Sequence, residues 1–172
     1  MLLPLEVWAA VATTSGYWTN GATWGGTPPA ANDDVTIGGG YTVTADVATV
    51  ALNSLTVDGT LVFSGWNTVI TSTTVTVNGK VTHLPQSDTN SAGGWTPDNR
   101  VWIACTNLTV ALGGSVNANS NGYPRKPYQA GSVTGAGPGG GAGGWPSWCA
   151  GGGYGGLGSA YDNGYGGGLT YG

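Results

Sequence analysis

The chain has few charged side chains. Its 172 residues include 4 Lys+Arg and 8 Asp+Glu, or 7% charged residues, whereas an ordinary globular domain carries about 25%. Glu6 is the single glutamate. This composition excludes coiled coils and helical bundles, which need many Glu, Lys and Leu residues. A formal net charge of −4 does not supply the basic face of a nucleic-acid-binding protein, so we expect no nucleic-acid partner.

Cysteine, histidine and long apolar runs are also scarce. No run reaches the ~18 apolar residues of a transmembrane helix, so we expect no membrane span. The one histidine is His83, and the two cysteines lack metal-ligand spacing, so we expect no metal site and no cofactor. A catalytic pair of cysteine and histidine would have no supporting motif.

Carboxylates are the groups that glycoside hydrolysis or lyase chemistry would need. No two of them recur in phase on one face of the repeat described below, and several lie beside turn residues. We therefore expect solvated turn residues, no catalytic residue and no enzyme. These carboxylates are Asp33, Asp34, Asp46, Asp58, Asp88, Asp98 and Asp162.

What the sequence does contain is an internal repeat in its Val/Thr-rich middle part. Val35-Thr36-Ile37, Leu55-Thr56-Val57 and Val75-Thr76-Val77 follow one another at steps of 20 residues, and Leu108-Thr109-Val110 comes 33 residues later. Val43 and Phe63 align at the same spacing, as do Leu61 and Val81, whereas Val116 lies two residues out of phase. The alternation predicts short strands with apolar side chains on one face and threonine on the other.

A period near 20 residues suits one coil of a parallel β-solenoid. We predict an all-β protein: a short parallel β-solenoid of about four coils, followed by an irregular layer rich in glycine and aromatic residues. The alternative is a β-sandwich with evenly spaced strands. An open solenoid end presents unpaired backbone groups and a slice of apolar core, so each end needs a cover.

The predicted organisation has three parts. Residues 1–34 form an N-terminal strand and a Trp/Pro-rich cap, and residues 35–129 form the solenoid with an inserted loop at 85–100. Residues 130–172 hold 19 glycines in 43 positions. We expect residues 2–12 to form an ordered strand, docked either on a neighbouring subunit or within the same chain.

Two further features predict covalent chemistry. A disulfide between Cys105 and Cys149 would tie the glycine-rich segment to the last coil, which favours an oxidising, extracellular setting. Asn107-Leu108-Thr109 is a sequon, which makes Asn107 a candidate glycosylation site. If Leu108 faces the core, Asn107 faces outward.

Aromatic residues are numerous, with 8 Trp and 8 Tyr. A small core cannot absorb all of them, so we interpret them mainly as packing anchors between glycine-rich segments or between subunits. Trp95 and Trp145 are in addition candidates for stacking on sugar rings. The predicted subunit interface comprises Leu2, Leu3, Leu5, Val7, Trp8, Trp145, Trp148, Tyr154, Tyr165 and Tyr171.

Several motifs occur along residues 15–172: Thr23-Trp24-Gly25-Gly26, Asp33-Asp34-Val35-Thr36-Ile37, Leu55-Thr56-Val57-Asp58-Gly59-Thr60-Leu61, Leu108-Thr109-Val110 and Gly151-Gly152-Gly153-Tyr154-Gly155-Gly156-Leu157-Gly158. With these motifs, residues 15–172 resemble bacterial extracellular β-helix surface proteins, similar to autotransporter passengers and adhesin-like repeats, with a glycine-rich insert. The resemblance implies a β-helix on the cell surface or in secreted form. It supplies no catalytic residue.

These observations favour an extracellular structural protein that assembles with copies of itself into a fibre or surface layer, by end-to-end and strand-docking contacts. The alternative is a carbohydrate-binding or adhesive module of a cell-surface protein that contacts surface glycans. A polysaccharide-active enzyme is the third hypothesis.

Overall fold

The structure is a computed structural model that describes residues 9–87 and 98–122, and two short strands at 143–144 and 148–149. The chain divides into two compact units. The first comprises Met1–Leu84 with Asn99–Asn121, and the second comprises Pro85–Asp98 with Gly122–Gly172. In the described residues the regular structure is β-strand apart from one short 3-10 helix, which confirms the all-β prediction.

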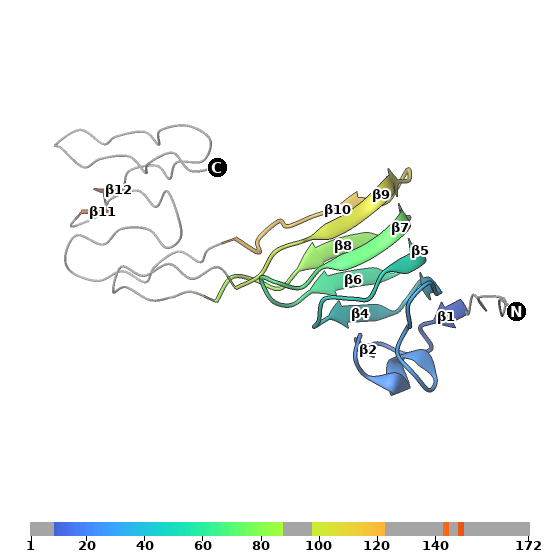
Figure 1. The fold of residues 1–172 in the computed structure, drawn as a ribbon. Helices are drawn as coiled ribbons and strands as arrows, with labels where there is room; N and C mark the ends of the chain where they lie inside the picture. The colour runs from blue at the N-terminus through green and yellow to red at the C-terminus, as the bar shows by residue number, and fades with distance from the viewer. Residues whose placement is uncertain (1–8, 88–97, 123–142, 145–147, 150–172) are drawn as a thin grey trace, which may run out of the picture. The chain divides into compact units, whose positions relative to one another are not determined.

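The first unit contains ten strands in two parallel sheets (Figure 1). They are β1 (Ala9–Val11), β2 (Gly16–Tyr17), β3 (Asp34–Ile37), β4 (Thr42–Ala45), β5 (Leu52–Val57), β6 (Thr60–Phe63), β7 (Ile70–Val77), β8 (Lys80–His83), β9 (Ile103–Val110) and β10 (Ser115–Val116). One sheet has the order β1-β3-β5-β7-β9, and the other has the order β10-β8-β6-β4-β2.

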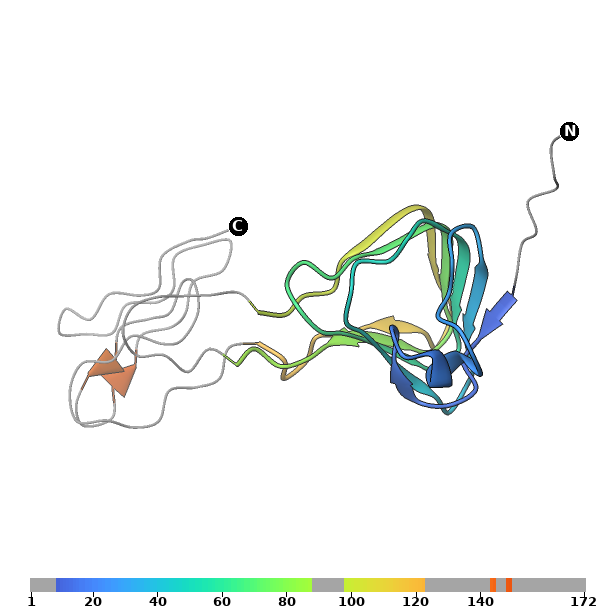
Figure 2. The ribbon, with the colours of Figure 1, turned by 60° about the horizontal axis from the view of Figure 1, so that its bottom comes forward.

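Each odd-numbered strand and the even-numbered strand after it form one coil, as the winding in Figure 2 shows. The fold is therefore a short parallel β-solenoid, as predicted. It has five coils in place of the expected four, because β1 and β2 add a first coil. The described residues of β1, Ala9-Ala10-Val11, lack the apolar-threonine-apolar triplet of the later coils, so the repeat in the sequence does not reveal this coil.

The core consists of apolar side chains stacked from coil to coil. Val35 pairs with Leu55, Leu55 with Val75, and Val75 with Leu108, which is the alignment predicted from the triplets. The first three of these side chains are at most 1% exposed. A second row, two positions further along each strand, is made of Ile37, Val57, Val77 and Val110.

Two other predicted alignments are wrong by two residues, because the turns between the sheets differ in length. Val43 pairs with Leu61, not with Phe63. Val116 pairs directly with Val81, so it is in phase. The turns at 38–41 and 111–114 are each two residues longer than those at 58–59 and 78–79, and this difference absorbs the offset.

Glycine is required at the short turns by the coil underneath. A methyl group at Gly59 would collide with the carbonyl oxygens of Gly38 and Tyr41, and one at Gly79 would collide with those of Asp58 and Gly59. Side chains add a polar contact between the same turns, since Asn78 Nδ2 donates to Asp58 Oδ1 at 2.7 Å.

The described part of the N-terminal segment pairs within its own chain. Residues Ala9–Val11 of β1 lie parallel to Asp34–Thr36 of β3. Of the two alternatives left open for residues 2–12, docking within the chain therefore holds for residues 9–11, while residues 1–8 lie outside the described residues.

In the second unit the structure describes a short antiparallel pair, β11 (Gly143–Gly144) and β12 (Trp148–Cys149). Gly143 pairs with Cys149, and Gly144 pairs with Trp148. The remainder of the expected glycine/aromatic layer lies outside the described residues.

Candidate functional site

The last coil leaves side chains exposed at positions that are buried in every inner coil. Leu108 is 50% exposed, although its partners in the row, Leu55 and Val75, are 0% exposed. Val110 is 46% exposed and Val116 is 48% exposed, for the same reason. Leu112, in the turn between β9 and β10, is also fully exposed. The inward-facing row of the solenoid thus ends in an apolar surface, called the open end below and defined by Leu108, Val110, Leu112 and Val116.

The open end also carries no charge. Between Val101 and Gly122 the sequence has no Asp, Glu, Lys, Arg or His. β9 is 8 residues long, contains no proline and lies at the edge of its sheet. Natural edge strands are normally blunted by charge, proline or shortness, because a bare edge pairs with other chains. β9 has none of these devices.

The opposite end of the solenoid is covered by the chain itself. A 3-10 helix, η1 (Gly21–Trp24), follows the first coil and is capped at its N-terminus by Asn20, whose side chain accepts from Ala22 N at 3.0 Å. Trp18 is 3% exposed and Trp24 is 8% exposed, and their rings meet edge to face at 5.0 Å between centroids.

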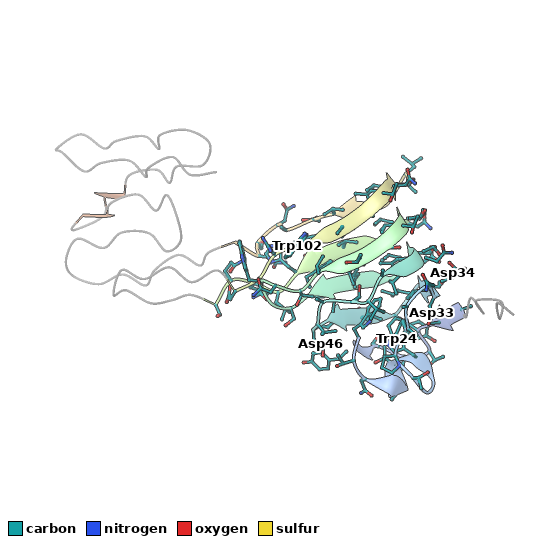
Figure 3. All side chains as sticks on the ribbon, viewed as in Figure 1. Trp24, Asp33, Asp34, Asp46 and Trp102 are labelled. Atoms are coloured by element: carbon teal, nitrogen blue, oxygen red, sulfur yellow. The ribbon has the colours of Figure 1, made fainter. Side chains whose placement is uncertain are left out.

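This cover is also held by hydrogen bonds. Trp24 Nε1 donates to Trp18 O at 2.8 Å, and Thr23 Oγ1 donates to Tyr17 O at 2.9 Å. Trp24 is labelled beside the first coil in Figure 3. The Trp-rich lead-in therefore caps the first coil, and the two ends of the solenoid differ.

A cluster that sequence reasoning missed fastens the start of the last coil. The Arg100 guanidinium lies 4.4 Å from the centroid of the Trp66 ring and 4.0 Å from that of Trp102. Arg100 Nε also donates to Trp66 O at 2.6 Å. Trp102, labelled in Figure 3, stays 40% exposed. We call this cluster, with Asn99, the arginine clamp.

Backbone contacts complete the clamp. Gly65 N donates to Asn99 Oδ1 at 2.8 Å, and Ile70 N donates to Trp102 O at 3.0 Å. Residues 99–102 are thus attached to residues 65–70 of the coil before. The two segments are far apart in sequence and irregular, so the repeat in the sequence does not predict their contact.

The two cysteines are not joined in the structure. Cys105 is a free, partly buried thiol on β9, among the residues that the structure describes. Cys149 ends β12 in the second unit, and its side chain lies outside the described residues. The expected disulfide is therefore not seen, and the pairing stays a prediction.

Asn107 and Thr109 are both exposed, and Asn107 pairs with Thr74 at an outward position of β9. This is the orientation predicted for the sequon. Leu108 has the expected inward phase, but it is half exposed because no sixth coil lies over it among the described residues.

Most of the predicted interface lies outside the described residues. This applies to Leu2, Leu3, Leu5, Val7, Trp8, Tyr154, Tyr165 and Tyr171, to the candidate carbohydrate contacts Trp95 and Trp145, and to the side chain of Trp148.

The described carboxylates hold turns and coil contacts. Asp33 Oδ2 accepts from Ala30 N at 2.8 Å, and Asp34 Oδ1 accepts from Asn53 Nδ2 at 2.7 Å. Asp46 accepts from the Thr19 hydroxyl at 2.6 Å, and Asp98 from Ser87 N at 2.7 Å. Each is thus engaged in local structure. Asp88 and Asp162 lie outside the described residues.

The described residues hold neither a metal-binding cluster nor a helix that could span a membrane. No group of three or more His, Cys, Asp or Glu there could hold a metal ion. Nor does that part of the chain hold a helix with the length and apolar character that a membrane span requires.

No curated protein and no solved structure matches the chain. Residues 23–84 are similar to the G8 domain. The matching region begins in η1 and ends directly after β8, so it takes in the second, third and fourth coils and stops before the open end.

Proposed function

We propose that this protein is an extracellular structural protein that assembles with copies of itself, through the open end of its solenoid, into a fibre or surface layer. The observation that carries the proposal is the contrast between the two ends. One is covered by Trp18 and Trp24, and the other exposes Leu108 and Val110 on an uncharged edge.

The energetics favour a cover for the open end. Burying an exposed leucine or valine side chain contributes about 1.5–3 kcal/mol. Leu108, Val110 and Val116 are each about half exposed. Covering them would therefore add about half of that free energy for each side chain. Pairing the β9 edge would also satisfy backbone N–H and C=O groups that otherwise face water. Repeat proteins place polar caps at such ends, and no described residue does so here.

The exposed sequon supports an extracellular setting, and the low charge supports packing between copies. The sequon residue Asn107 is exposed and accessible to a modifying enzyme. Low charge and abundant threonine on the outward faces suit a surface that packs against neighbouring copies.

The substitution Leu108→Lys tests the proposal, because it places an ammonium group in the apolar slice. We expect wild-type protein to sediment as assemblies in analytical ultracentrifugation, and the variant to sediment as a monomer. Val50→Lys is the matched control, since Val50 is 49% exposed and lies in the segment between β4 and β5, away from the open end. Assemblies should persist in that control.

Electron microscopy of the same samples separates fibres and layers from small oligomers. A wild-type protein that remains monomeric at all accessible concentrations contradicts the proposal. Equal assembly by both lysine variants would mean that the contact lies elsewhere.

One observation favours a second candidate function, the binding of carbohydrate. Trp102 is 40% exposed and its ring contacts the Arg100 guanidinium, and an exposed indole can stack on a sugar ring. If Trp102 contacts glycans, Trp102→Ala should abolish binding on a glycan array. Tyr17→Ala, which removes a 57% exposed ring near the other end, should leave binding intact.

A further inference from the structure

We infer that Asn121-Gly122 is a self-modification site, at which Asn121 deamidates in the folded protein and thereby detaches residues 117–121 from β8. Asparagine is thermolabile, and a following glycine favours its deamidation because glycine has no Cβ to hinder the approach of the two groups. Such pairs begin at Asn20, Asn78, Asn121 and Asn163, and the last of them lies outside the described residues. The inference does not depend on the proposed function.

The reaction needs only the chain itself and water. The backbone nitrogen of Gly122 attacks Cγ of Asn121, the Cγ–Nδ2 bond breaks, and ammonia leaves with the proton that the nitrogen gives up. The product is a five-membered succinimide. Water then adds to one of its two carbonyl groups, which leaves aspartate or isoaspartate at position 121. The nucleophile is therefore the backbone nitrogen of the glycine, and its surroundings decide which pair reacts.

The pair at Asn78 is held against this reaction by the coil before it. The Gly79 N–H donates to Val57 O at 2.8 Å, so the nitrogen that would attack is directed at that carbonyl group. The side chain is held as well, because Asn78 Nδ2 donates to Asp58 Oδ1 at 2.7 Å. Deamidation at Asn78 therefore requires the coils to separate locally.

The pair at Asn20 is held by its position as the N-cap of η1. Asn20 has φ −86° and ψ 115°, which turns the nitrogen of Gly21 away from the Asn20 side chain. Rotation about ψ to bring the two together would break the hydrogen bond from Ala22 N to Asn20 Oδ1. Deamidation at Asn20 therefore requires the cap to open.

The pair at Asn121 has a free nucleophile. Gly122 is exposed, and a methyl group built on it would have nothing within 4 Å. Its N–H has no hydrogen-bond partner among the described residues. The Asn121 backbone is held by the turn bond from its N–H to Ala118 O at 3.1 Å, which does not involve the Gly122 nitrogen. Ring closure here therefore requires no separation of coils.

Deamidation removes the donor that ties this segment to β8. Asn121 Nδ2 donates to Thr82 Oγ1 at 2.9 Å and to His83 O at 2.5 Å. A carboxylate has no N–H group, so it would meet the His83 carbonyl oxygen with repulsion in place of a hydrogen bond. It would also place a negative charge in residues 101–122, a stretch that has no charged side chain.

Peptide mapping of aged protein tests the choice of site. The folded protein is kept in mildly alkaline buffer and digested with trypsin, which cleaves after Lys80 and Arg100 and so separates Asn121 from Asn20 and Asn78. Mass spectrometry should show Asn121 deamidating about tenfold faster than either of the other two, because they react only through local opening. In concentrated urea the three rates should converge.

Two results of this experiment overturn the inference. One is equal deamidation of Asn121 and Asn78 in the folded protein, and the other is deamidation of Asn121 only in urea. The variant Gly122→Ala checks the chemistry, because its methyl group hinders the attack but contacts no other part of the structure. It should slow the reaction of Asn121 and leave those of Asn20 and Asn78 unchanged. An unchanged Asn121 rate in this variant would contradict attack by the Gly122 nitrogen.

A pair of aspartate variants tests the release of the segment. Asn121→Asp imitates the product, and Asn119→Asp adds the same charge at an exposed position of the same segment. The readout is hydrogen exchange at the Asn117 amide, which donates to Val81 O at 2.8 Å. We expect faster exchange in Asn121→Asp and unchanged exchange in Asn119→Asp. Equal exchange in the two variants would overturn the release of residues 117–121.

Discussion

At the turns between the two sheets, glycine occurs where one coil crosses the carbonyl groups of the coil before it. Gly79 lies over the carbonyl oxygens of Asp58 and Gly59 with no room for a methyl group. Backbone atoms cannot move aside as a flexible side chain can. The two coils can therefore stack this closely only because residue 79 has no side chain.

We predict that Gly79→Ala lowers the free energy of unfolding by about 3 kcal/mol, the upper range for overpacking a tight site. Gly39→Ala is the control, because nothing lies within 4 Å of a methyl group at Gly39. That control should change stability by less than about 1 kcal/mol. Urea unfolding followed by circular dichroism measures both values, and equal effects would contradict the explanation.

The arginine clamp supports a second prediction at this scale. Lysine keeps the charge of Arg100 but cannot lie flat between two indole rings or donate from Nε to the Trp66 carbonyl. Arg100→Lys should therefore destabilise the solenoid by about 1–2 kcal/mol. Chemical unfolding measures this change. Lys80→Arg, at an exposed position of β8, should leave the unfolding midpoint unchanged.

At the scale of elements, the first coil depends on η1 more than on its own strands. The described residues of β1 and β2 number 5, and the ends of the two strands are tied to η1 by hydrogen bonds from Thr13 N and from the Thr23 hydroxyl. The inner strands β5 and β7, by contrast, pair on both sides. The cap and the first coil should therefore open together, ahead of the inner coils.

Removal of the Trp24 side chain tests this dependence. Trp24→Ala creates a cavity against Trp18 and removes the donor to the Trp18 carbonyl, so we expect a loss of about 3–5 kcal/mol. Hydrogen exchange should rise most at β1 and β2, and least at β5 and β7. Uniform loss of protection over all coils would show that the solenoid unfolds as one unit.

At the scale of the whole molecule, the proposed assembly depends on apolar contact rather than on charge. Ionic screening weakens attractions between exposed charges, but it has little effect on apolar burial. Sulfate strengthens apolar association, because it is excluded from protein surfaces.

We therefore predict that the dissociation constant of the assembly changes less than about threefold between 50 and 500 mM sodium chloride. Half-molar sodium sulfate should tighten it. Sedimentation equilibrium measures both effects. A steep weakening with chloride would point to an ionic contact, which the open end cannot provide.

The coil register was predictable where strands repeat and unpredictable where the chain is irregular. The triplets at Val35, Leu55, Val75 and Leu108 predicted the stacking correctly, because apolar residues alternate with period two and the spacing between them is regular. Turn lengths were not predictable, so Val43 and Val116 were aligned two residues from their true partners.

Tertiary contacts between distant residues were not predictable either. Trp66 and Arg100 are separated by 34 residues, and their contact depends on how the chain returns after the insertion. The open end was expected in principle as a consequence of the fold. Which end is open became clear only from the structure. The first coil is covered by the segment that contains η1, whereas Leu108 and Val110 of the last coil are exposed.

The arginine clamp has one more consequence. Because Asn99, Arg100 and Trp102 reattach the chain to residues 65–70, the winding resumes in phase whatever the length of the stretch between Leu84 and Asn99. A foreign peptide inserted into this stretch is therefore expected to leave the stacked coils in place.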